Sequence, residues 1–259
     1  MVISSRKNEN VCIIRELIKS AEYRRETDMF AVEGDHLCGE LAACENCSTL
    51  EYFLYTEKAA QRYPETVRRA MEKAFFSAVI TEELSEYISD TKSPQGLFAA
   101  AERFGKEIPE NARRLVVLDG VGDPGNVGTI IRPAEALGFD GVIFTGACAD
   151  RFSPKTLRAS MGSVFRMPSH YPSDMAALKK RLSLSGFTLY GAMLDENAAR
   201  LGAETFPEKT AVVIGSEGAG ISPEIAALCD KKLYIPISGA ESLNAAIAAA
   251  IIMWEVTRS

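Results

Sequence analysis

The sequence predicts an α/β protein of two domains, the second built on a largely parallel sheet. Short apolar segments alternate with segments of helical periodicity along the chain. In the C-terminal part these apolar segments hold few polar residues, which is typical of parallel strands covered on both faces. A length of 259 residues, of which 47% are hydrophobic and 25% charged, fits this organisation.

The first domain is expected over residues 1–105 as a small α/β unit. Helical spacing over residues 8–30 leads into a strand that ends at Gly34. Further helices are expected at 36–44 and 64–75, and further strands at 50–55, 77–80 and 93–104. The polar stretch 105–114, with a glycine and a proline, predicts a linker, so the boundary is placed near residue 106.

The second domain is expected over residues 106–259. Its candidate strands are 114–119, 141–146, 187–193, 211–217 and 233–237. Loops rich in Gly, Ser or Asn follow three of them, at 120–128, 215–222 and 238–244. Open parallel sheets bind ligands beyond the carboxyl ends of their strands, so these loops are the candidate site.

The composition favours a soluble cytoplasmic protein. The N-terminus is charged where a signal peptide would be apolar, and the longest apolar stretch, 243–254, is too short to span a bilayer. Six cysteines without a signal peptide indicate reduced thiols. Cys38, Cys44 and Cys47 near His36 lack the second paired knuckle of strong zinc sites, so we expect thiols packed in a helix and turn, and no metal.

Charge is unevenly distributed. Residues 1–110 hold 14 basic and 20 acidic side chains and so carry the whole net charge of −6, which leaves residues 111–259 neutral. Within that neutral part, residues 151–181 hold seven basic side chains and one acid. Such a stretch is either a phosphate-binding footprint or a solvated face.

Gly120, Gly122 and Gly125 form a G-x-G-x-x-G motif after an apolar strand, but its surroundings argue against a dinucleotide site. Asp140 precedes the next strand, where it cannot reach a ribose. Pro124 removes a donor N–H that a pyrophosphate would need, and it suits the first position of a helix after Asp123.

Four segments, in order, resemble the SpoU/TrmH branch of the SPOUT superfamily of RNA methyltransferases. The first contains Asn126 and Arg132, the second is a basic loop at 155–168, the third contains Gly215 and Glu217, and the fourth reads SLN at 242–244. The N-terminal part is similar to the ribosomal-protein-like RNA-binding domain often fused ahead of this branch, through residues 4–34 and 89–96.

The resemblance implies a C-terminal trefoil knot that binds S-adenosylmethionine. Gly215 and Gly218 would allow close approach of the backbone to this cofactor. Ile235, Ile237 and Leu243 would wall the adenine ring.

The reaction implied is methyl transfer to a ribose 2′-hydroxyl of rRNA or tRNA. Arg132 would clamp a phosphate and stabilise the forming alkoxide, since arginine is a poor base. Asn126 and Asn244 would orient Arg132 and the ribose. Glu217 would hold the arginine or another basic group, and Ser242 would form a hydrogen bond nearby. Each also has a structural alternative: Asn126, Ser242 or Asn244 as a helix cap, and Glu217 as a surface acid. The residues implied to bind RNA are Arg151, Lys155, Arg158 and Arg166.

The last helix is apolar nearly all round, so it must be buried on several sides. The resemblance implies a dimer interface that would supply the second burial surface, so we expect a homodimer. Pro133 stands where this branch commonly has threonine. A helix therefore either kinks or begins there, which changes the orientation expected for the Arg132 side chain. Two other functions stay open: a catalytically silent RNA-binding protein and, less favoured, an NAD-dependent dehydrogenase. The sequence does not identify the target nucleotide.

Overall fold

A computed structural model describes residues 2–239 and 242–258. The chain forms two compact units: residues 1–105 with 152–165, and residues 106–151 with 166–259. The change of unit after Gly105 falls at the boundary expected from the linker, whereas residues 152–165, expected in the second domain, pack with the first unit. As a division into separately functioning domains, the boundary stays a prediction.

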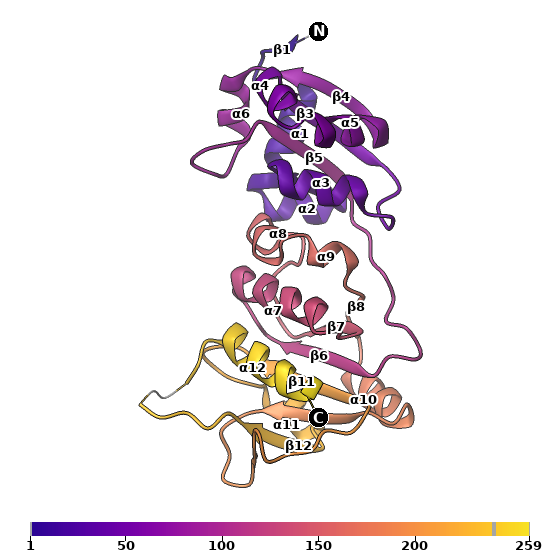
Figure 1. Ribbon diagram of the computed structural model, residues 1–259, viewed down its shortest axis with the longest axis vertical. Coiled ribbons are helices and arrows are strands. Elements are labelled where there is room, and N and C mark those ends of the chain that lie inside the picture. Colours follow the sequence, from indigo (N-terminus) through magenta and orange to yellow (C-terminus); the bar gives the residue numbers. More distant parts are fainter. Residues whose placement is uncertain (1, 240–241, 259) are drawn as a thin grey trace. The chain divides into compact units, whose positions relative to one another are not determined.

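The N-terminal unit is a five-stranded sheet with helices on both faces (Figure 1). The strand order is β1-β4-β3-β5-β2, with parallel pairing from β1 to β3 and antiparallel pairing from β3 to β2. The strands are β1 (Val2–Ile3), β2 (Met29–Glu33), β3 (Leu50–Thr56), β4 (Ala74–Ile80) and β5 (Leu97–Glu102). The helices are α1 (Glu9–Lys19), α2 (Ala21–Thr27), α3 (Asp35–Ala43), α4 (Glu57–Arg62), α5 (Pro64–Lys73), α6 (Glu82–Ile88), α8 (Pro154–Ser160) and α9 (Ser163–Arg166).

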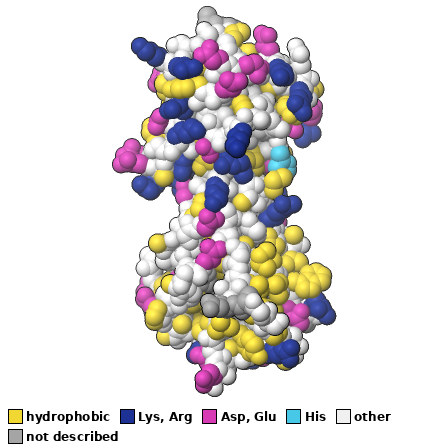
Figure 2. Space-filling model, turned by 90° about the vertical axis from the view of Figure 1, so that its left-hand side faces the viewer, with side chains coloured by type: hydrophobic (Ala, Val, Ile, Leu, Met, Phe, Trp, Pro, Cys, Tyr) yellow, Lys and Arg dark blue, Asp and Glu magenta, His cyan; other side chains and the backbone are white. Residues whose placement is uncertain are grey.

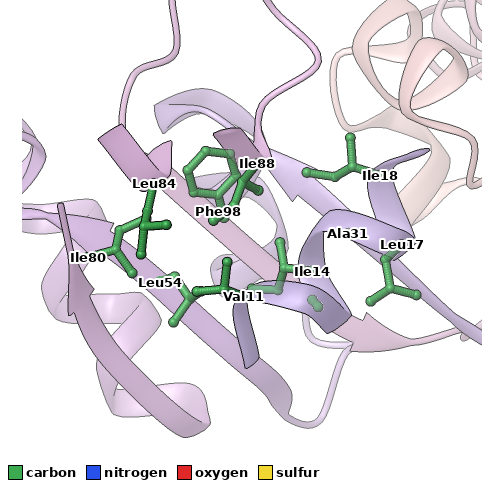
Figure 3. Packing of buried hydrophobic residues seen from close by; sticks show 11 residues of the cluster. Val11, Ile14, Leu17, Ile18, Ala31, Leu54, Ile80, Leu84, Ile88 and Phe98 are labelled. Atoms are coloured by element: carbon green, nitrogen blue, oxygen red, sulfur yellow. The ribbon is translucent and has the colours of Figure 1, made fainter. Parts of the chain in front are cut away.

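Helix α1 shows how this unit forms its core. Asn8 caps it by accepting hydrogen bonds from the amides of Asn10 and Val11. Its apolar side chains recur at helical spacing and lie on one side, against the sheet and α6 (Figure 3). The buried cluster contains Val11, Ile14, Leu17, Ile18, Ala31, Leu54, Ile80, Leu84, Ile88, Phe98 and Ala100.

Residues 152–165 belong to the N-terminal unit because of an aromatic cluster. The Phe152 ring stacks on Phe30 of β2, with ring centroids 4.5 Å apart, and meets Phe104 edge-on at 6.0 Å. Phe165 packs against Phe30 and Phe104, each at 6.0 Å. Rings this large dominate core energetics, so the cluster explains why this segment lies against β2.

The C-terminal unit is a seven-stranded sheet, parallel at every pairing, in the order β10-β12-β9-β11-β6-β7-β8. The strands are β6 (Arg114–Asp119), β7 (Gly141–Thr145), β8 (Ser169–His170), β9 (Thr188–Ala192), β10 (Ala199–Arg200), β11 (Thr210–Gly215) and β12 (Lys231–Tyr234). The helices are α7 (Pro124–Ala136), α10 (Met175–Leu184), α11 (Pro223–Leu228) and α12 (Ala245–Arg258). The parallel α/β architecture expected from the sequence is confirmed; the knot stays a prediction.

Helices cover both faces of this second sheet. Leu178 and Leu182 of α10 and Ile225 of α11 pack on one face, against alternate residues such as Leu115 and Val117 of β6. Helices α7 and α12 contact each other, and α12 also contacts β11. Coverage on both faces is why β6, β7 and β11 are apolar almost throughout.

Within residues 2–239 and 242–258, no helix is both long and apolar enough to cross a membrane.

Truncating Phe152 to alanine should destabilise the protein by about 3–5 kcal/mol, because this ring is 1% exposed and its loss leaves a cavity against Phe30. Urea unfolding followed by circular dichroism measures the change. Phe75→Ala is the matched control, since Phe75 is 83% exposed. Equal unfolding midpoints for the two variants would contradict this packing.

Candidate active site

Three chain segments far apart in sequence meet at the carboxyl edge of the second sheet. β6 ends at Asp119 and β11 ends at Gly215, and these two residues are paired in the parallel ladder. Turns leave both strands there, one toward Asn126 and one through Glu217. The start of α12 brings Asn244 to the same place, as its hydrogen bonds to both side chains require.

Asn126, Glu217 and Asn244 form a closed hydrogen-bonded trio. Glu217 Oε1 accepts from Asn126 Nδ2 at 2.5 Å and from Asn244 Nδ2 at 2.6 Å. Asn244 Nδ2 also donates to Asn126 Oδ1 at 3.0 Å. Each pair of side chains in the trio is therefore joined directly, although the three residues are separated by up to 118 positions.

Local capping interactions fix two members of the trio. Asp123 caps α7 by accepting from the amide of Asn126, and Pro124 is the first helical residue, as the sequence predicted. Asn244 Oδ1 accepts from the amides of Ala246 at 3.0 Å and Ile247 at 3.2 Å, so it caps α12 while its Nδ2 serves the trio. The capping and functional interpretations of Asn244 are thus compatible.

A cavity of about 390 Å³ lies beside the trio, with Glu217 on its wall. Most of the residues predicted for a cofactor line it: Gly215, Ile235, Ile237 and Leu243, together with Ser242. Gly218 is not among its lining residues. Ala192, Met193 and Leu194, at the end of β9, also line the cavity and were not among the predicted site residues. Their position at the carboxyl end of a predicted strand was the available signal.

Gly215 has no room for a side chain. A Cβ at this position would lie 2.1 Å from the backbone carbon of Gly220 and 2.3 Å from the nitrogen of Ile221. The missing side chain therefore gives room to the chain's own turn, in which Ser216 and Gly220 pair. Gly215 also lines the cavity, and its approach to a cofactor stays a prediction. Around Gly218, by contrast, the space is open.

Arg132 lies on α7 and forms no hydrogen bond to the described side chains of the trio. Its side chain is exposed, and among the described residues it forms no hydrogen bond or ion pair. Helix α7 begins at Pro124 and continues through Pro133 to Ala136, so it does not begin at Pro133. Pro133 removes one backbone donor close to the helix end, where Leu137 still donates to the carbonyl of Pro133.

The dinucleotide interpretation fails on the structure as well. Asp140 lies at the amino edge of the sheet, where its Oδ2 accepts from the amides of Arg113 at 2.7 Å and Arg114 at 2.9 Å. This carboxylate is at the opposite edge from the trio. Gly120 has a φ of +63°, which explains a glycine directly after β6.

The basic residues predicted to bind RNA are largely engaged within the chain. Arg151 is 8% exposed and donates to Ser169 Oγ. Arg158 Nη2 donates to Asp90 Oδ2 at 3.2 Å, and Arg166 makes two hydrogen bonds to the Glu135 carboxylate. Lys155 is exposed on α8. A phosphate would have to compete with these carboxylates for Arg158 and Arg166.

Cys38, Cys44 and Cys47 pack as buried side chains. Among the described residues, no group of three or more His, Cys, Asp or Glu could hold a metal ion. Burial, with Glu33 and Asp35 nearby, raises the pKa of the Cys38 thiol far above its usual range, and burial raises the pKa of Cys47 as well. Neutral thiols at these positions behave as small hydrophobic side chains.

Asn244→Asp tests the trio's geometry, because aspartate still caps α12 but puts a second carboxylate against Glu217. Like charges raise carboxylate pKa values, so the variant should lose about 1 kcal/mol or more of stability near pH 7. The loss should shrink as the pH falls toward about 4 and one carboxylate is protonated. Thermal unfolding at both pH values measures this, with Asn244→Ser as the uncharged cap. A pH-independent difference from wild type would contradict the contact.

Comparison with known proteins identifies the family. Residues 113–254 match the SpoU rRNA Methylase family, and residues 8–99 match the MRM3-like substrate binding domain. The 23S rRNA (guanosine(2553)-2'-O)-methyltransferase RlmP of Bacillus subtilis (strain 168) is 33% identical over 258 residues, which cover 98% of each chain.

Solved structures show the same fold along the chain. The AdoMet-bound rRNA methyltransferase from Sinorhizobium meliloti superimposes with a TM-score of 0.87 at 27% identity, covering 100% of this chain and 97% of that one. The SpoU methyltransferase AviRb from Streptomyces viridochromogenes, in complex with AdoMet, gives 0.82 at 28% identity, covering 97% and 98%. The resemblance drawn from the four sequence segments is confirmed, and the chain belongs to the SpoU rRNA methylase family.

Proposed function

We propose that this protein transfers a methyl group from S-adenosylmethionine to a ribose 2′-hydroxyl of rRNA or tRNA. The observation that carries the proposal is the Asn126–Glu217–Asn244 trio, whose Glu217 lines a cavity with a largely apolar wall. The activity named for RlmP and the AdoMet bound in two structural neighbours agree with it.

The cavity suits this cofactor. Its volume of about 390 Å³ lies in the range of small-molecule sites, about 300–1,000 Å³. Ile235, Ile237 and Leu243 offer an apolar wall for a base, and the turn from Ser216 to Gly220 lines another part of the cavity. The Glu217 carboxylate supplies negative charge on the wall, which favours a cationic ligand.

The bound cofactor supplies a methyl group already activated on its sulfonium sulfur. The chain's own residues must orient the ribose, exclude water and stabilise the 2′-oxygen as its proton leaves. Glu217 Oε1 holds both carboxamides, whereas Glu217 Oε2 has no partner among the described residues. This oxygen can accept from a ribose hydroxyl, and the second amide hydrogen of Asn126 can donate to one.

Arg132 completes the site as a phosphate clamp. Its guanidinium is exposed and free of partners within the described residues, so no internal ion pair has to break when RNA binds. Arginine keeps its proton at any working pH, which makes it an electrostatic stabiliser of the alkoxide rather than a base. Lys155, which is exposed on α8, contributes a further contact to an RNA phosphate, whereas Arg158 and Arg166 contribute one only when a phosphate displaces Asp90 and Glu135. Arg151 is buried against Ser169 and supports this surface from within, and Ser242 contributes a hydroxyl at the cavity.

We place this reaction in the cytoplasm and in a homodimer. Ile247, Ile251 and Trp254 of α12 are exposed by 50%, 38% and 55%, and their spacing puts them on one stripe of the helix. Figure 2 shows hydrophobic side chains gathered on one face of the C-terminal unit. A second copy of the same helix would cover this stripe through a twofold contact.

Arg132→Ala should lower the methylation rate by about 100-fold or more and leave cofactor affinity unchanged, since Arg132 does not line the cavity. Methyl incorporation into ribosomal RNA from cells lacking the gene, mapped at 2′-hydroxyls, measures the first quantity. Titration with S-adenosylhomocysteine measures the second. Arg181→Ala, which removes another exposed guanidinium from α10, is the control. Full activity of Arg132→Ala would refute the clamp, and absent methylation by a cofactor-binding wild type would favour a silent RNA-binding protein.

Trp254→Glu should convert a dimer to the 28.2 kDa monomer, because a charge is placed in the proposed interface. Light scattering coupled to size-exclusion chromatography measures the mass. Leu184→Glu changes an 80% exposed leucine on α10 and should leave the dimer intact. A monomeric wild type would rule the dimer out.

A further inference from the structure

The buried carboxylate of Asp119, at the end of β6, belongs to neither the trio nor the cavity wall. Asp119 is the last residue of β6 and is 4% exposed. No lysine, arginine or histidine of the described chain forms an ion pair with it. A buried carboxylate without a cation is costly unless hydrogen bonds satisfy it, so its partners indicate what it is for.

Each oxygen of this carboxylate holds a different segment. Asp119 Oδ1 accepts from Thr145 Oγ1, the last residue of β7, at 2.9 Å. Asp119 Oδ2 accepts from the backbone amide of Ser222 at 2.7 Å. The Asp119 side chain thus links the ends of β6 and β7 to Ser222. Ser222 is the residue at which the loop after β11 ends and α11 begins.

That loop, residues 216–222, forms one side of the cavity. Ser216, Glu217, Ala219, Gly220 and Ile221 all line it. Its first part is held by the pairing of Ser216 with Gly220. Its far end is held by the Asp119 hydrogen bond to Ser222, and Asp119 also begins the turn that leads to Asn126.

We propose that Asp119 is a positioning residue for the methyl-donor cavity. It fixes the loop 216–222 relative to β6, so that Glu217 meets Asn126 and the cavity keeps its shape before the cofactor binds. This inference rests on the proposed function. Preorganisation of this kind raises affinity, because the loop does not have to be ordered at the moment of binding.

The chain contains a matched control for this role. Asp140 also accepts two hydrogen bonds from backbone amides, those of Arg113 and Arg114, but at the opposite edge of the same sheet. Asp140→Ala should therefore lower thermal stability without altering the cavity. Asp119→Ala should lower stability and also release the loop.

The experiment compares both alanine variants with Asp119→Asn and Thr145→Val. Hydrogen exchange of the amides at 216–222 reports the loop directly, and titration with S-adenosylhomocysteine reports the cavity. Asp119→Ala should exchange faster in this loop and bind about tenfold more weakly, which corresponds to the loss of one hydrogen bond to a charged group. Asp140→Ala should bind within about twofold of wild type.

Asp119→Asn should restore wild-type behaviour. Its oxygen can still accept from Ser222, and its amide can donate to Thr145 Oγ1, which in turn donates to the carbonyl of Leu118 at 3.2 Å. Thr145→Val removes one of the two hydrogen-bond partners of Asp119. Its affinity for S-adenosylhomocysteine should lie between those of wild type and Asp119→Ala, and this variant tests the role of Asp119 if Asp119→Ala does not fold.

The inference would be overturned if Asp119→Ala and Asp140→Ala showed the same hydrogen exchange at 216–222 and the same affinity for S-adenosylhomocysteine. The proposed function would then remain in place. An Asp119→Asn variant as weak as alanine would also overturn the inference, since charge and not geometry would then be decisive. A wild-type protein that does not bind S-adenosylhomocysteine would instead refute the proposed function.

Discussion

The site depends on one geometric constraint: parallel strands in register end at the same edge of the sheet. Asp119 of β6 pairs with both Gly215 of β11 and Thr145 of β7. The turns that follow these strands therefore start side by side, although the strands are far apart in sequence. Side chains that follow these strands, such as Asn126 and Glu217, can therefore form direct hydrogen bonds without long connecting loops. The contacts of Asp119 with Thr145 and of Asn126 with Glu217 follow from that alignment, and the start of α12 adds Asn244 to them.

Much of this could be predicted from the sequence, because the signals were local. Apolar strands such as 114–119 and 141–145, and the cap and first proline of α7, are decided by neighbouring residues. The meeting of Asn126, Glu217 and Asn244 was expected from family resemblance and not from periodicity, since no local rule joins residues 27, 91 and 118 positions apart.

The features that were missed depend on tertiary packing. The sequence gives no sign that residues 152–165 lie against β2, because their phenylalanines read as ordinary apolar residues until Phe30 is seen to stack on Phe152. Gly215 was expected only to allow a ligand to approach, and the structure adds a second constraint there, the chain's own backbone at Gly220. Likewise, Arg158 and Arg166 look like free cations until Asp90 and Glu135 are found beside them.

Helix α12 explains why one segment can be apolar on all sides in a globular protein. Ala245, Ala248 and Ile252 face the cavity, while Ala246, Ala249, Met253 and Val256 are buried in the unit. The third stripe, with Trp254, is the exposed one. Because Asn244 both caps this helix and binds Glu217, any shift of α12 along its axis would move a wall of the cavity and a member of the trio together. A partner packed on the exposed stripe, as in the proposed dimer, would restrain that shift and would thereby link assembly to the geometry of the site through a single helix.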